Sequence, residues 1–202
     1  MKRLVVTAAA ICLLIVLGAA GLWALESRES DRTGLAREEI LTLDASTRAT
    51  FLQVVDDHLQ TAPERVGDTF LTDEKPELGP RTFCHEDLIE IRRKSANAYL
   101  VGVVATCEEF ARSGDTLLSG TGFRSPLLVT LEAAKGRFEV RHVEETGDGS
   151  MNLPSIRAMF SPEGAPRAHE LSGYGSPDLP EGTGDEARLA FGLPLTAKIV
   201  HP

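Results

Sequence analysis

The stretch from Leu127 to Glu145 constrains the fold of this chain most, because its apolar and polar residues alternate on both sides of a turn. A period of two places successive side chains on opposite faces of a β-strand. Lys135-Gly136 interrupts the alternation with residues that suit a two-residue hairpin turn. We therefore predict an antiparallel hairpin with one apolar face and one mostly polar face.

The register of this hairpin decides which side chains face the core. With a two-residue turn at 135–136, His142 lies opposite Val129 on the apolar face. A histidine in that position is a hydrogen-bonded core residue, an edge residue facing solvent, or a polar group lining a small cavity. All three interpretations stay open at this point, and only the cavity would suggest a ligand.

Two further strands are predicted before the hairpin, at 83–93 and at 99–110, where apolar and β-branched residues lie between charged ones. If the turn between them falls at Ser95-Ala96, Cys84 lies directly opposite Cys107. In an exported domain, two thiols placed in this way predict a cross-strand disulfide. Such a bridge would leave no thiolate for catalysis.

The apolar face of this sheet needs a cover, and the sequence before it provides one. Apolar residues recur at helical spacing between Asp44 and Pro63, namely Phe51, Leu52, Val55 and Leu59. A shorter helix is predicted at 153–160. We predict an α+β domain at 44–162, with the first helix packed on a small antiparallel meander sheet.

Residues 163–202 are rich in proline and glycine and show no sustained periodicity. A segment of this composition buries too little apolar surface to offset the entropy of ordering the chain. We predict a disordered tail, in which the apolar stretch at 189–195 would at most dock weakly.

An uncharged apolar run extends from Leu4 to Leu25, directly after Lys2-Arg3. A helix of this length reaches about 33 Å at about 1.5 Å per residue, enough to cross a hydrocarbon core of about 30 Å. Basic residues before such a span keep the N-terminus in the cytoplasm. We predict a single-pass anchor at 1–25 and a stalk at 26–43, with the domain outside the cytoplasm. Cleavage near Gly18-Ala19-Ala20, which would release a secreted protein, is the alternative.

Charge and composition exclude one class of partner. The chain has 30 acidic and 21 basic residues, a net charge of −9, and only 5% aromatic residues. Such a surface repels phosphate backbones and offers few rings on which bases could stack. We predict no binding of nucleic acid.

Candidate ligand contacts are few. Arg124 follows a glycine-rich stretch at 120–122, and Ser150 closes the loop at 147–150. If these segments meet at one end of the sheet, Arg124, Ser150 and Arg157 would receive an anionic or peptide group. No nucleophile, phosphate-binding or metal-ligand motif has the required spacing, so we predict no catalytic residue, no metal and no cofactor.

Two segments carry a resemblance to other proteins. The first segment, 119–131, has the sequence Ser-Gly-Thr-Gly-Phe-Arg-Ser-Pro-Leu-Leu-Val-Thr-Leu. The second, 148–162, has the sequence Asp-Gly-Ser-Met-Asn-Leu-Pro-Ser-Ile-Arg-Ala-Met-Phe-Ser-Pro. The pattern at 83–162 resembles uncharacterised exported or membrane-anchored proteins of high-GC Gram-positive bacteria, a resemblance that implies no activity. The order of helix and meander is similar to cystatin-like and nuclear-transport-factor-like folds, which serve binding modules and enzymes alike.

The absence of a catalytic motif in an exported domain favours a non-catalytic binding or accessory module of the cell envelope, with a cell-surface protein or peptide as its partner. Two alternatives remain. The first is an enzyme whose site surrounds His142. The second is a structural partner of a membrane complex, engaged through the anchor or the tail.

Overall fold

A computed structural model describes residues 39–61, 70–173 and 182–201 of the chain. The predicted anchor at 1–25 and most of the predicted stalk lie outside these residues. Within the described ranges, we find no helix that combines the length and the apolar character needed to span a membrane.

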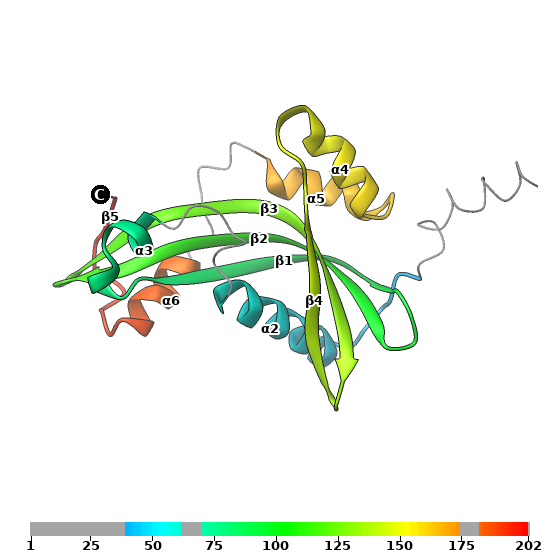
Figure 1. Cartoon of the computed structure of the whole chain (residues 1–202), viewed down its shortest axis with the longest axis horizontal. Helices are drawn as coiled ribbons and strands as arrows, with labels where there is room; N and C mark the ends of the chain where they lie inside the picture. Colours follow the sequence, from blue (N-terminus) through cyan, green and yellow to red (C-terminus); the bar gives the residue numbers. More distant parts are fainter. Residues whose placement is uncertain (1–38, 62–69, 174–181, 202) are drawn as a thin grey trace, which may run out of the picture. The chain divides into compact units, whose positions relative to one another are not determined.

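The described residues form an α+β fold built on a mixed sheet of five strands (Figure 1). The four long strands follow one another as an antiparallel meander: β1 (Arg81–Arg93), β2 (Ala98–Ser113), β3 (Thr116–Ala134) and β4 (Arg137–Glu145). The short strand β5 (Ile199–Val200) pairs in parallel with the beginning of β3.

Helices cover both faces of this sheet. Figure 1 shows α2 (Ala45–Thr61) and α6 (Gly182–Ala190) on one face, with α4 (Asn152–Met159) and α5 (Gly164–Ser172) on the other. The remaining short helices are α3 (Phe70–Glu74), η3 (Pro76–Leu78) and η4 (Gly149–Met151). The prediction of a sheet with one polar face is therefore wrong, because α4 and α5 bury Leu100, Val104 and Leu128 on that face.

The predicted amphipathic helix is confirmed as α2. Its apolar stripe of Phe51, Val55 and Leu59 is buried against the first face of the sheet. The helix begins directly after Asp44, whose carboxylate accepts hydrogen bonds from the backbone N–H and the hydroxyl of Thr47. This cap satisfies a backbone donor that the first turn of a helix leaves unpaired.

The predicted pairing of Cys84 with Cys107 is also confirmed, although the register predicted from a turn at 95–96 is wrong beside that turn. Arg93 lies opposite Tyr99, one residue away from the predicted register, and an irregularity between Leu88 and Glu90 restores the predicted pairing farther along the strands. Cys84 lies directly opposite Cys107 in the register of β1 and β2, and the two residues form a disulfide. Both cysteines are buried in the core beneath α2.

The predicted position of His142 is wrong. The β3–β4 hairpin follows the expected register from its turn to Val140, but the register then shifts by one residue at Arg141. As a result His142 lies opposite Thr130 and is exposed, whereas Val143 packs against the core. A single extra residue on one strand reverses the faces of everything beyond it.

The prediction of a structureless tail is likewise wrong for its described part. Helices α5 and α6 each bury an alanine completely, Ala168 and Ala187, and Leu193 is buried after α6. The backbone N–H of Leu117 donates to the carbonyl of Lys198 at 2.9 Å, which ties the end of the chain to β3. Small residues allow these helices to approach the sheet closely, a form of packing that a search for large apolar residues misses.

Candidate functional site

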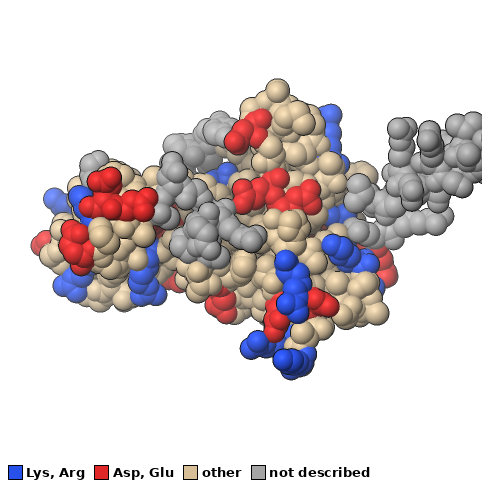
Figure 2. Space-filling model, in the orientation of Figure 1, with Lys and Arg blue, Asp and Glu red and all other residues tan. Residues whose placement is uncertain are grey.

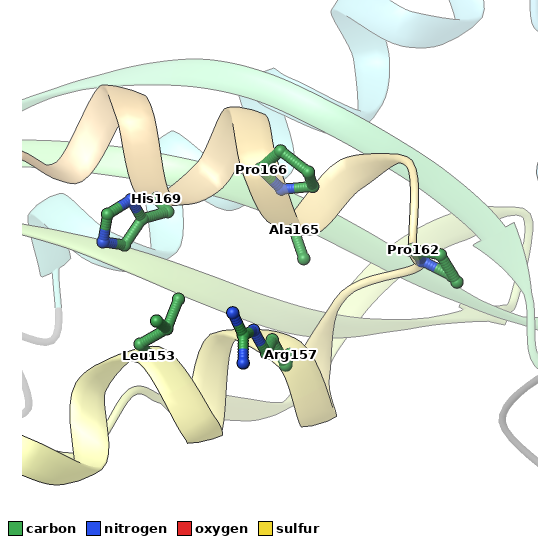
Figure 3. Close-up of a pocket in the computed structure, with 6 residues that line it drawn as sticks. All are labelled: Leu153, Arg157, Pro162, Ala165, Pro166 and His169. Carbon is green, nitrogen blue, oxygen red and sulfur yellow. The ribbon is translucent and has the colours of Figure 1, made fainter.

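A groove lies between α4 and α5 (Figure 3) and has a volume of about 570 Å³. It lies within the range of about 300–1,000 Å³ that ligand sites usually have. Its lining residues are Leu153, Arg157, Pro162, Ala165, Pro166 and His169. Figure 3 shows Leu153 and Arg157 extending from α4 toward α5, and His169 and Ala165 lying on the side of α5 that faces α4.

The two helices that form the groove are seated firmly on the sheet. Ile156 and Met159 of α4 and Ala168 of α5 are buried in one cluster, together with Leu100 and Val104 of β2. Neighbouring side chains divide between this cluster and the groove: Ile156 and Ala168 are in the cluster, whereas Arg157 and His169 line the groove. The opening is therefore bounded by helices that packing holds in place.

A buried ion pair on β1 holds the link between the two helices. Glu90 and Arg92 form an ion pair at 3.0 Å, and the Arg92 guanidinium donates to the carbonyl of Met159 at 2.6 Å. The Glu90 carboxylate accepts hydrogen bonds from the backbone N–H (2.9 Å) and the hydroxyl of Ser161. The Ser161 hydroxyl in turn accepts from the N–H of Gly164 at 2.9 Å, at the beginning of α5.

Gly164 is the position where this arrangement leaves no room for a side chain. A Cβ atom placed there would lie 2.3 Å from a carboxylate oxygen of Glu90. The glycine thus permits the close approach of α5 to β1 that brings Ser161 within hydrogen-bonding distance of the carboxylate.

The polar groups of the groove are cationic or neutral. Arg157 and His169 are exposed, and neither side chain has a hydrogen bond or ion pair among the described residues. The other lining residues, Leu153, Pro162, Ala165 and Pro166, are apolar. The groove therefore combines an unpaired guanidinium, which offers several N–H donors, with an apolar wall.

A second, smaller pocket of about 260 Å³ contains Arg124. The guanidinium lies 3.7 Å from the carboxylate of Asp87, and its Nε is buried without a hydrogen-bond partner in the described part of the chain. Ser119, in the same pocket, donates to the Glu108 carboxylate. Apart from that Nε, the charged groups of this pocket already have partners: Arg124 pairs with Asp87, and Glu108 accepts from Ser119. The pocket therefore has fewer free polar groups for a ligand than the groove.

The candidate residues predicted from the sequence do not form one site. Arg124 and Arg157 line different pockets, and Ser150 lines neither. His142 is exposed on β4 and belongs to neither pocket. The prediction that Arg124, Arg157 and Ser150 share a ligand is not supported by their positions. His169 and Pro166 were missed, because the segment that carries them was expected to lack structure.

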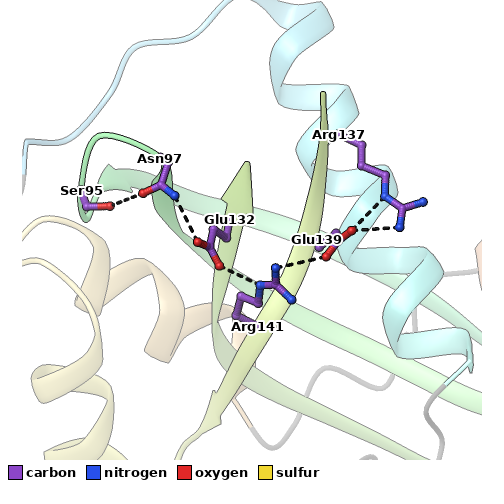
Figure 4. A network of polar contacts seen from close by, with 6 residues as sticks. All are labelled: Ser95, Asn97, Glu132, Arg137, Glu139 and Arg141. Atoms are coloured by element: carbon purple, nitrogen blue, oxygen red, sulfur yellow. Dashed lines mark hydrogen bonds and ion pairs between the residues drawn. The ribbon is translucent and has the colours of Figure 1, made fainter. Parts of the chain in front are cut away.

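A row of charged residues on the β3–β4 hairpin is neutralised internally. In Figure 2 basic side chains gather over the end of this hairpin, and Figure 4 shows how they are paired. Arg141 donates to Glu132 at 2.7 Å and lies 3.2 Å from Glu139, which also pairs with Arg137. The hydrogen bond from Arg137 lowers the pKa of Glu139. These mutually paired charges form a solvated surface and offer no free group to a ligand.

Three carboxylates meet where α2 and α6 lie beside β1. Glu86 of β1 has one carboxylate oxygen buried with no hydrogen-bond partner among the described residues. Burial, together with the negative charges of Asp56 on α2 and Glu186 on α6, raises the pKa of Glu86 to about 8. Burial also raises the pKa values of Asp56 and Glu186. Across all residues that the structure describes, no group of His, Cys, Asp and Glu has an arrangement that could hold a metal ion.

The raised pKa of Glu86 makes stability depend on pH. Its folded-state pKa, about 8, exceeds the ordinary value of 4.5, so the folded state retains a proton that the unfolded chain releases. This stabilisation is complete below about pH 4.5 and is lost as the pH rises through about 8. We expect Glu86→Gln to change the free energy of unfolding by less than about 1 kcal/mol at pH 5 and to raise it by several kcal/mol, at most about 5 kcal/mol, at pH 9.

Urea unfolding at pH 5, 7 and 9 measures this difference. Glu144→Gln, at an exposed position on β4, is the matched control and should follow the unmodified protein at every pH. Parallel pH profiles for Glu86→Gln and the unmodified protein would contradict the assignment.

Comparison with protein-family models, with curated proteins and with solved structures gave no match for this chain. The resemblance to exported proteins of high-GC Gram-positive bacteria therefore stays a prediction made from the sequence.

Proposed function

We propose that this chain is a non-catalytic binding module of the cell envelope, anchored by residues 1–25 with its domain outside the cytoplasm, and that it binds its partner in the α4–α5 groove. The observation that carries the proposal is the guanidinium of Arg157, which has no partner in the described part of the chain and lies in a largely apolar groove. Binding sites typically combine apolar walls with a few polar groups that fix orientation.

Two further observations support this proposal. The Cys84–Cys107 disulfide is typical of proteins in oxidising compartments, in agreement with export by the apolar run at 4–25. The packing of α2 against an antiparallel meander is in keeping with a cystatin-like or nuclear-transport-factor-like architecture, in which a helix and a sheet present a binding surface. The enzyme alternative rested on a cavity around His142, and neither pocket described above includes that residue.

Photo-crosslinking in living cells tests the proposal. A photoreactive amino acid replaces Leu153, which lines the groove, or Glu144, which is exposed on β4 and serves as the control. After irradiation, mass spectrometry of the full chain from the membrane fraction should show an adduct at position 153 only. Adding Arg157→Glu should abolish the adduct, because it reverses the charge at the centre of the groove.

Three results would count against the proposal. The first is equal adduct yields at positions 153 and 144. The second is an adduct at 153 that survives Arg157→Glu. The third is recovery of the chain with free thiols from the cytoplasmic fraction.

A further inference from the structure

We infer that the occupant of the α4–α5 groove is a single-chain amphipathic anion, a molecule with one carboxylate or phosphate head and one unbranched apolar chain. This inference rests on the proposed function, because it names the class of ligand for the same groove.

The head group follows from charge complementarity. The chain has 30 acidic residues, yet none of the described residues that line the groove is acidic. Both titratable lining residues, Arg157 and His169, carry N–H donors. An arginine that has no carboxylate partner within 39–61, 70–173 and 182–201 of so acidic a protein is available to an anion from outside. A guanidinium binds carboxylate or phosphate oxygens through two parallel hydrogen bonds.

The apolar chain follows from the rest of the lining. Leu153, Pro162, Ala165 and Pro166 present hydrocarbon surface and no side-chain donor or acceptor. A saccharide or an extended peptide would bring many polar groups into this space, and those that face the apolar wall would lose their hydrogen bonds to water without replacement. A hydrocarbon chain gains from the same surface, because the water that covers it is released.

The groove is also preformed. The Glu90–Arg92 pair fixes both the end of α4 and the beginning of α5, at Met159 and Ser161. Because the helices need not move to admit a ligand, little binding energy is lost to reorganisation. A preformed groove with a cation beside an apolar wall selects for the combination of head and chain.

Calorimetry on the full chain in nanodiscs of zwitterionic lipid tests the inference, with empty nanodiscs as the blank. The probes are octanoate and octyl phosphate, compared with octanol, which lacks the charge, and acetate, which lacks the chain. We expect octanoate and octyl phosphate to bind at least about tenfold more tightly than octanol or acetate, the ratio produced by about 1.4 kcal/mol.

Arg157→Ala should weaken octanoate binding about tenfold and leave octanol binding unchanged, and Arg157→Lys should restore part of the loss. The matched control is Arg167→Ala, an exposed arginine on α5 that does not line the groove, which should bind octanoate normally. Circular dichroism verifies that each variant is folded.

Octanoate binding equal to that of octanol, or unchanged by Arg157→Ala, would overturn the inference. If position 153 forms an Arg157-dependent adduct with a protein or peptide and octanoate does not bind, the binding module stands and the amphipathic anion is wrong. If neither the adduct nor octanoate binding is found, both proposals fail.

Discussion

Replacing Arg92 by Met is expected to lower the free energy of unfolding by about 3–5 kcal/mol, as measured by urea or guanidinium titration. The side chains of Arg92 and Glu90 are only 2% and 4% exposed, and their ion pair lies between β1 and the link from α4 to α5. Removing the guanidinium leaves the Glu90 carboxylate buried without its counter-charge, and the carbonyl of Met159 loses a donor. The loss is large because water cannot replace either partner.

An exposed ion pair of the same chain is the matched control. Arg141 and Glu132 approach to 2.7 Å, which is closer than the buried pair, but their side chains are 47% and 37% exposed (Figure 4). Arg141→Met should therefore change the free energy of unfolding by less than about 1 kcal/mol. If Arg92→Met lowers the free energy of unfolding as little as Arg141→Met does, burial does not determine how much an ion pair of this chain contributes to stability.

A double-mutant cycle separates the pair from its surroundings. Glu90→Gln and Arg92→Met each leave one charge unpaired, whereas the double variant leaves none. We expect the double variant to be more stable than the sum of the single effects by about 2 kcal/mol. Additive effects would mean that the two residues act through Ser161 and Met159 separately.

The elements that sequence could predict are those whose side chains alternate strongly. Strands β1 and β2 and the pairing of Cys84 with Cys107 could be predicted from their apolar residues and from an assumed turn at 95–96. The irregularity between Leu88 and Glu90, which offsets a one-residue shift at that turn, has no sign in the sequence pattern. The α2 helix was predicted from large apolar residues one turn apart. Alternation fails to reveal the extra residue Arg141, because it lies among charged residues that suit either face. Without this extra residue, the predicted register placed His142 on the apolar face, whereas in the structure its side chain is exposed.

The groove could be predicted only in part. Arg157 was identified as a candidate anion contact, and it does line the groove. The other wall belongs to α5, whose buried face consists of Gly164, Ala165 and Ala168. Residues this small contribute little to apolar periodicity, so nothing local distinguishes such a helix from a linker. Glu90 and Arg92 were equally hidden, because charged residues at alternate positions of a strand normally indicate a solvent-exposed face.

Loss of the Cys84–Cys107 bridge is the second large effect that we expect. The bridge closes a loop with a sequence separation of 23 residues. In the chain-entropy model such a loop restricts the unfolded state by about 3 kcal/mol. The double variant Cys84→Ala/Cys107→Ala should therefore unfold with a free energy lower by about 3 kcal/mol, and reduction of the unmodified protein should produce a similar loss.

The reductant supplies its own control, because it should leave the stability of the double variant unchanged. A loss below about 1 kcal/mol would contradict the expected contribution.

The same bridge also tests the proposed location of the domain. Thiol labelling under non-reducing conditions should find Cys84 and Cys107 protected when the chain is made with residues 1–25, and reactive when that segment is deleted and the domain stays in the reducing cytoplasm. Because the cytoplasmic form lacks the bridge, it should also be less stable by about 3 kcal/mol, so export and stability are coupled through this one bond.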